Sequence, residues 1–160
     1  MSAPDSNDDA CPVPLSRYEQ VVLGHGGGGR LSADLLSQLF LPGLGDRGPD
    51  AREDQATLPV EAGRIALTTD AFVVHPRFFP GGDLGALSIY GTVNDLAVGG
   101  ARPRWVAAAF VIEEGLPLAE LARIVASMRA ACERADVTLV TGDTKVVDRG
   151  KGDGLFITTT

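Results

Sequence analysis

The sequence predicts an α/β fold, an α+β sandwich in which helices cover one face of a four-stranded, mainly mixed sheet. Strand-like apolar stretches alternate with long helical patterns, which is the order expected of such layers. The chain has 160 residues, of which 44% are hydrophobic and 22% are charged, as in an ordinary globular domain with one core. No apolar run approaches the roughly 20 residues of a membrane span, so we expect no membrane partner.

β-Branched, aromatic and apolar residues predict four strands, at 64–74, 104–113, 137–147 and 154–160. The second of these is apolar almost throughout, which indicates a strand that is buried on both faces. The chain stops within the last strand, and we interpret this as a truncation before a second domain.

The first helix is expected at 31–44, where Ser32 can serve as the N-cap and Pro42–Gly43 as the stop. A second helix is expected at 82–101, ending at Gly99–Gly100. Its apolar residues recur at a spacing of three to four: Leu84, Leu87, Tyr90, Val93, Leu96 and Ala97.

The clearest helix is expected at 116–135 and begins near Pro117. One face of it is apolar and consists of Leu121, Ile124, Val125, Met128 and Cys132. Cys132 is therefore interpreted as a buried thiol. The other cysteine, Cys11, lies in a polar, proline-rich leader at 1–14 that we expect to be disordered, which leaves 15–160 as the folded domain.

The formal net charge of −7 argues against a nucleic-acid binder, which would carry a basic surface. It does not argue against nucleotide binding, because acidic residues can hold the Mg²⁺ that accompanies phosphates. The start of the sequence is not that of a secretory signal peptide, so we expect a cytoplasmic protein.

Four aspartates, Asp70, Asp83, Asp95 and Asp143, could carry chemistry. Asp70 and Asp143 end strand-like stretches, where a carboxylate needs a partner, and hard oxygen ligands suit Mg²⁺. Asp83 and Asp95 lie on one predicted helix, about 18 Å apart along its axis, so they cannot share an ion. Asp95 therefore groups with Asp70 and Asp143. The alternative is that each aspartate caps a helix or shapes a turn.

A run of four glycines, Gly26, Gly27, Gly28 and Gly29, follows His25. A backbone without side chains suits a tight turn, a flexible linker or close approach to a bulky anion. His25 could be a turn residue, touch a phosphate or take part in proton transfer.

Two further positions leave alternatives open. Lys145, two residues beyond Asp143, could reach a phosphate or be a solvated strand lysine. The segment before Asp83 could be a capped turn, or could place backbone N–H groups beside an anion.

Taken together, five segments resemble the HypE family of hydrogenase maturation factors, within the superfamily of aminoimidazole ribonucleotide synthetase, selenophosphate synthetase and thiamine-monophosphate kinase. Ala71 stands where the family pattern leads us to expect serine, and Gly27 departs mildly from the loop pattern. The segments are HGGGG, TTDAFVV, FFPGGDLG, GTVNDLAVGGARP and TGDTKVVDRGKGDGLFITT.

The resemblance implies the first of two α/β domains, with ATP and Mg²⁺ as cofactors. The glycine-rich loop would cover the phosphates. The implied metal ligands are Asp70, Asp95 and Asp143. The implied nucleotide-binding residues are Gly26, Gly27, Gly28, Gly29, Asn94, Thr141 and Gly142. The implied catalytic residues are Asp83, Lys145 and His25.

The implied activity is the ATP-dependent dehydration of a carboxamide on a C-terminal cysteine to a thiocyanate, which supplies cyanide to a nickel–iron hydrogenase. Neither Cys11 nor Cys132 occupies that acceptor position. The implied partners are a second copy, bound through the sheet face, and other maturation proteins, namely the carbamoyl donor enzyme and iron-centre assembly factors. The alternatives are a small-molecule kinase of the same superfamily and a non-catalytic dimerisation or docking fragment.

Overall fold

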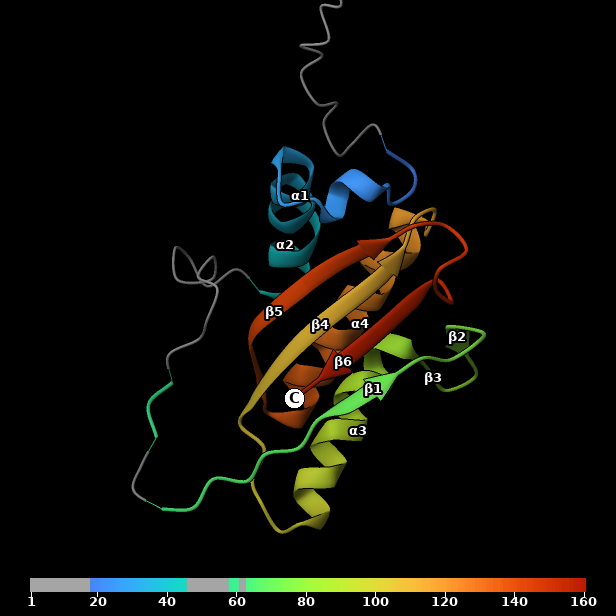
Figure 1. Cartoon of the computed structure of the whole chain (residues 1–160). Coiled ribbons are helices and arrows are strands. Elements are labelled where there is room, and N and C mark those ends of the chain that lie inside the picture. The colour runs from blue at the N-terminus through green and yellow to red at the C-terminus, as the bar shows by residue number, and fades with distance from the viewer. Residues whose placement is uncertain (1–17, 46–57, 61–62) are drawn as a thin grey trace, which may run out of the picture.

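The computed structural model describes residues 18–45, 58–60 and 63–160 (Figure 1). The leader expected at 1–14 and its Cys11 lie outside the described residues.

A four-stranded mixed sheet forms the centre of the domain, as the sequence predicts. Its strands are β1 (Asp70–Phe72), β4 (Trp105–Glu113), β5 (Thr138–Val147) and β6 (Leu155–Thr159). The order across the sheet is β1-β6-β4-β5. Strand β6 is antiparallel to both of its neighbours, whereas β4 and β5 are parallel and are joined by a helix.

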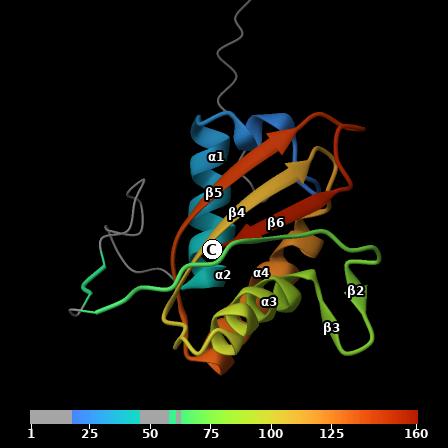
Figure 2. The same cartoon turned by 60° about the horizontal axis from the view of Figure 1, so that its bottom comes forward.

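Two long helices, α3 (Leu84–Val98) and α4 (Leu118–Ala135), lie on the same face of this sheet (Figures 1 and 2). The apolar stripe expected on α4 is buried throughout, including the thiol of Cys132. On α3 the expected stripe is only partly correct. The buried face of α3 carries Ile89 with the small residues Ser88 and Thr92, whereas Leu87 is exposed. A β-carbon at Gly85 would collide with the backbone of Ile124 in α4, so the close contact of the two helices requires glycine there.

The first helix covers residues 30–44, within one residue of the expected 31–44. It consists of α1 (Arg30–Leu35), the π-helical turn η3 (Leu36–Phe40) and α2 (Leu41–Leu44), and a separate 3-10 turn, η2 (Leu23–Gly26), precedes it. The N-cap is Gly29, and Ser32 lies inside the first turn. Pro42 does not stop the helix, since the wider π turn just before it accommodates a residue without an N–H. The helix ends at Gly45, which has φ of +98°.

The strand expected at 64–74 is much shorter in the structure. Only Asp70–Phe72 pairs with a neighbour, so Asp70 begins the strand rather than ending it. Residues 63–69 pair with no strand, and the side chains of Ile65 and Leu67 are 73% and 82% exposed. The β-branched composition that predicts a strand here has no partner strand within the described chain.

The two faces of the sheet differ in burial. Alternate residues of β4, including Ala108 and Phe110, are buried under the helices, whereas the residues between them are half-buried and Val111 is 37% exposed. We call the second face the open face. The expected burial of β4 on both sides is therefore wrong for the single chain, because the helices of the described residues lie on the other side (Figure 2).

No helix among the described residues is long and apolar enough to cross a membrane.

Candidate functional site

The four glycines after His25 serve different purposes. A β-carbon at Gly26 would lie 2.6 Å from the backbone nitrogen of Val146, so the loop can rest on β5 only if this residue is glycine. Gly28 has φ of +76°, which favours glycine on backbone grounds. Nothing lies within 4 Å of a β-carbon placed at Gly28 or Gly29. The loop is therefore packed at its first glycine and open above its last two.

Ser32 holds the far end of this loop. The N–H of Gly28 donates to Ser32 Oγ at 2.9 Å, and the hydroxyl in turn donates to the carbonyl of Gly24 at 3.5 Å. The serine predicted to cap the helix thus stabilises the loop that precedes it. This role could not be predicted from the sequence, because a serine that caps a helix and a serine that bonds to the preceding loop have the same local pattern.

A cavity of about 620 Å³ opens beneath the loop, between the first helix and strands β4 and β5. Its volume is in the range of small-molecule sites. One end is apolar and is formed by Leu35, Leu36, Phe40, Leu41, Leu44 and Phe110. The other end is polar and is formed by His25, Gly26, Gly28, Ser32, Thr141, Gly142, Asp143 and Thr144. Six of the sequence-predicted site residues therefore share one cavity.

His25 is almost completely buried at the loop side of this cavity, with 1% of its surface exposed. Its Nδ1 accepts a hydrogen bond from the backbone N–H of Val22 at 3.0 Å, and its ring meets that of Tyr18 edge-on at 5.1 Å. Burial lowers the pKa of His25, and the charge of Asp34 opposes this shift. The imidazole is therefore neutral at pH 7.

Asp143 and Lys145 belong to the open face of the sheet. Their register partners in β4 are Ala109 and Val111, which lie on that face, whereas Gly142 pairs with the buried Ala108. Because side chains alternate along a strand, Asp143 borders the cavity with its backbone and directs its carboxylate to the other side. Lys145 is exposed there.

Asp70 and Asp95 form a pair of carboxylates at the opposite edge of the sheet. The pKa of Asp70 is raised mainly by burial. The nearby charge of Asp95 and hydrogen bonding with that side chain raise it further. Thr68 Oγ1 adds a donor to Asp95 Oδ2 at 3.5 Å. Asn94, beside Asp95 on α3, is exposed. The expected meeting of Asp70 with Asp95 occurs in the structure.

The expected cluster of three aspartates does not form within one chain. Asp70 pairs with the buried Thr159 and so faces the helices, whereas Asp143 faces the other way. Three strand spacings, about 14 Å, separate β1 from β5. Within residues 18–45, 58–60 and 63–160 no group of three histidine, cysteine or acidic side chains could hold a metal ion. Sequence spacing could not reveal this, because the strand order depends on where β6 inserts.

Asp83 is the N-cap of α3. Its Oδ1 accepts the N–H of Ala86 at 2.9 Å, and its backbone pairs with Phe78 in a short hairpin of β2 (Phe78–Phe79) and β3 (Gly82–Asp83). The alternative of a capped turn therefore describes its contacts in the structure. It lies apart from the residues that line the cavity.

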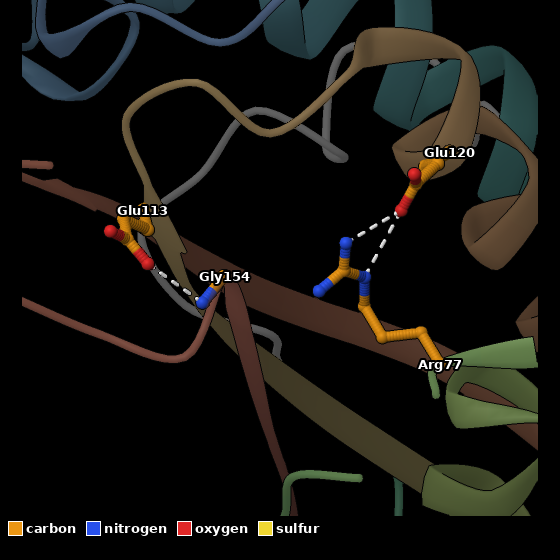
Figure 3. Close-up of polar contacts among 4 residues, drawn as sticks. All are labelled: Arg77, Glu113, Glu120 and Gly154. Carbon is orange, nitrogen blue, oxygen red and sulfur yellow. Dashed lines mark hydrogen bonds and ion pairs between the residues drawn. The ribbon is translucent and has the colours of Figure 1, made fainter. Parts of the chain in front are cut away.

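Sequence reasoning missed the carboxylate of Glu113, which holds the loop between β5 and β6. Its two oxygens accept the N–H groups of Gly150 and Gly154, at 2.5 and 2.9 Å, and Figure 3 shows the second of these bonds. The signal was present as three glycines at 150, 152 and 154, which expose backbone donors that need an acceptor.

A second missed interaction joins Arg77 to Glu120 in the first turn of α4 (Figure 3). Arg77 donates from Nε at 3.1 Å and from Nη2 at 2.8 Å to the same carboxylate oxygen, and both side chains are partly buried. A β-carbon at Gly154 would lie 2.6 Å from the guanidinium, so Arg77 also packs against the β5–β6 loop. Gly154 belongs to one of the segments that carry the resemblance, and Arg77 directly precedes another.

These features define an α/β domain with a mixed four-stranded sheet, helices on one face and a glycine-rich loop beside a cavity. The family described as AIR synthase related protein, N-terminal domain, matches residues 52–160, and the chain belongs to it.

Within this family, the chain is similar to carbamoyl dehydratases named HypE. It is 54% identical over 144 residues to that of Azotobacter vinelandii, covering 90% of this chain and 42% of the relative. It is 46% identical over 144 residues to that of Escherichia coli K12, covering 87% of this chain and 43% of the relative. The chain thus spans about two-fifths of the length of these curated relatives.

Among solved structures, the crystal structure of the hydrogenase maturation protein HypE in complex with ATP superposes with a TM-score of 0.81 at 48% identity. The match covers 86% of this chain and 41% of that one. The resemblance found in the sequence motifs is therefore confirmed, as is the fold class.

Proposed function

We propose that this chain is the nucleotide-binding domain of a hydrogenase maturation protein that dehydrates a cysteine-bound carboxamide with ATP. The observation that carries the proposal is the open glycine loop above a cavity of about 620 Å³. The likeness to a HypE solved with ATP supports it. The polyphosphate would lie against the N–H group of Gly29, where no β-carbon of Gly28 or Gly29 keeps it away.

Calorimetry with Mg²⁺-ATP on the 160-residue chain tests this proposal. Gly29→Val places a branched side chain in the space above the loop, so we expect ATP affinity to fall about tenfold or more while folding is retained. The control is Ala126→Val, which adds bulk at an exposed position of α4 away from the cavity. Gly45→Val would not serve, because the positive φ of Gly45 disfavours any side chain. ATP affinity that is the same in Gly29→Val and the parent chain would contradict the placement.

We further propose that Asp70 and Asp95 hold Mg²⁺. Asp70 lies close enough to Asp95 for that charge to raise its pKa, and two neighbouring carboxylates offer the hard oxygen ligands that Mg²⁺ prefers. The ion would neutralise charge on the phosphates. Asp143 would contribute only if a second copy or a rearrangement brings it to the same nucleotide, since its carboxylate lies on the open face.

Magnesium titrations of Asp70→Asn and Asp143→Asn separate these roles. We expect Asp70→Asn to lose Mg²⁺-dependent ATP binding and Asp143→Asn to lose it only in the dimer. Unchanged Mg²⁺ dependence in Asp70→Asn, with intact folding, removes that residue from the metal site.

A second copy is proposed to bind the open face. Its half-buried side chains are largely apolar and include Trp105, Ala107, Ala109, Val111 and Phe156. An isologous pair would remove this apolar surface from water on both copies. Sedimentation equilibrium checks the proposal: a clean monomer at micromolar concentration would exclude the dimer, and polydisperse material would favour aggregation through the same face.

The complete reaction needs more than this chain. The catalytic roles of Asp83 and Lys145 stay proposals, since the first is an N-cap and the second is exposed on the open face. The buried thiol of Cys132 is not an acceptor that a donor enzyme can reach. We therefore expect no ATP-dependent thiocyanate on this chain alone, and mass spectrometry that finds one on Cys11 or Cys132 would contradict the assignment.

Other maturation proteins are proposed as partners, and a solved HypE–HypF complex with a TM-score of 0.60 supports this. Pull-down with a carbamoyl donor enzyme tests it. The cytoplasmic location stays a prediction that cell fractionation can test.

A further inference from the structure

His25 is fixed in one orientation by its surroundings. The backbone N–H of Val22 donates to Nδ1, and the edge-on ring of Tyr18 restrains the imidazole. A ring nitrogen that accepts a hydrogen bond carries no proton, so the proton of the neutral ring is on Nε2. The geometry thus selects one tautomer.

That proton has no acceptor. Nε2 is buried and makes no hydrogen bond to any residue that the structure describes. Buried polar atoms without partners are rare in folded proteins, and each one calls for an explanation such as a ligand. His25 also lines the cavity beneath the glycine loop. An acceptor bound in that cavity could therefore satisfy this donor once Nε2 is uncovered.

We propose that His25 is a positioning residue whose Nε2–H donates a hydrogen bond to a phosphate oxygen of the nucleotide in the cavity, while Nδ1 anchors the start of the glycine loop. The inference rests on the proposed function and deepens it. Nε2 is covered in this structure, so the bond forms as the loop shifts. The open space around Gly28 and Gly29 permits that shift.

The same geometry excludes His25 as a general base in this conformation. The nitrogen that could take a proton, Nδ1, is occupied by the N–H of Val22. The groups that face the ring from neighbouring elements are the carboxylate of Asp34 on α1 and the phenol of Tyr18. His25 instead links occupancy of the cavity to the order of the loop.

Imidazole ¹⁵N spectra of the full 160-residue chain test the assignment directly. The chain has two histidines, and the exposed His75 serves as an internal reference. We expect His25 to show the Nε2–H tautomer, with its proton shifted downfield and slowed in exchange when Mg²⁺-ATP is added. Unchanged His25 signals at an ATP concentration that saturates the site by calorimetry would overturn the proposal.

Two variants separate the two ring nitrogens. The Oδ1 of Asn can replace Nδ1 as the acceptor for Val22 and offers no donor at the position of Nε2, whereas the longer Gln can return a donor there. We expect His25→Asn to keep the parent melting temperature and bind ATP about tenfold more weakly, and His25→Gln to recover part of that loss. His75→Asn is the matched control and should bind as the parent does.

The outcomes distinguish this inference from the function on which it rests. If the parent chain binds ATP and both His25 variants bind it equally well, the role of His25 is overturned and nucleotide binding stands. If the parent chain binds no ATP, the proposed function fails and the role of His25 fails with it. If His25→Asn does not fold, the spectra of the parent chain decide.

Discussion

Two glycine-rich loops flank strand β5, and they are stabilised in opposite ways. The loop at 24–30 comes from an earlier part of the chain. It is held by the Ser32 hydroxyl, which accepts the N–H of Gly28 and donates to the carbonyl of Gly24, and it has open space above its last glycines. The loop at 148–154, after the strand, is held by both oxygens of Glu113 and packs against Arg77. Glycine thus leaves open space above the first loop, whereas in the second loop it allows the backbone to pack closely against Arg77.

The difference shows that glycine content by itself does not mark a binding loop. What separates the two is where the backbone N–H groups go. In the second loop the carboxylate of Glu113 already accepts the N–H groups of Gly150 and Gly154, so these two donors are not available to an external anion. In the first loop the N–H of Gly29 faces no such acceptor within the described bonds, and the cavity lies beneath.

The largest effect should come from filling the packed end of the first loop. Gly26→Ala puts a β-carbon 2.6 Å from the backbone of Val146, and backbone must move to relieve it. We expect a loss of about 2–3 kcal/mol in the free energy of unfolding, measured by urea denaturation. Gly29→Ala is the control, since its β-carbon meets nothing, and should change stability by less than about 0.5 kcal/mol. Equal losses in both would show that the loop is not seated on β5.

The clasp of the second loop should rank next. In Glu113→Gln the amide nitrogen faces one of the two N–H donors that the carboxylate now accepts. We expect about 1–2 kcal/mol of destabilisation, with faster amide exchange at Gly150 and Gly154. Glu114→Gln, which loses part of one exposed bond to the N–H of Leu23, should have a smaller effect. A larger loss of stability in Glu114→Gln than in Glu113→Gln would mean that the bond to Leu23, and not the bonds to the second loop, is the more important one.

Backbone strain at Gly28 is expected to have a smaller effect. Its φ of +76° costs an L-residue about 1 kcal/mol, with no added contact because the surrounding space is empty. Thermal denaturation of Gly28→Ala should therefore show a loss between those of Gly26→Ala and Gly29→Ala. A loss as large as that of Gly26→Ala would indicate a contact that the structure does not contain.

The smallest effect should be a dependence on pH. The pKa of His25 is lowered in the folded chain, so the unfolded chain binds more protons below the ordinary value near 6.5. The stability that the neutral ring contributes is present above that pH and is lost as the pH falls through the folded pKa. We expect the melting temperature to fall more between pH 7.5 and pH 5 in the parent chain than in His25→Asn. Parallel curves would show that burial of this ring does not affect stability.

Much of the fold could be predicted because its long elements follow simple periods. The buried face of α4 and the bounds of β4 and β5 agree with their apolar patterns. The short strand at Asp70 could not be delimited, since strand length there depends on β6 and not on local composition. Pro42 was misjudged because a π turn, which has no simple sequence pattern, precedes it.

The candidate site was only partly accessible for a similar reason. Sequence order showed that His25 and its glycines precede a helix, but only the tertiary structure brings Thr141 and Gly142 of β5 to the same cavity. The pairing of Asp70 with Asp95 follows from the nearness of β1 to α3. The separation of Asp143 from both follows from strand alternation and strand order, neither of which local motifs encode.

The position of β6 has a consequence for how the chain acquires its structure. This strand follows the other strands in sequence, yet it lies between β1 and β4. Asp70 of β1 pairs with Thr159 of β6. Such distant pairing closes a long loop, which slows folding relative to local contacts. On the ribosome, the unit of β4, α4 and β5 can assemble first, while β1 waits for Leu155–Thr159 to emerge. Until β6 is in place, the edge of β1 that pairs with it remains available to chaperones or to the equivalent strand of another nascent chain.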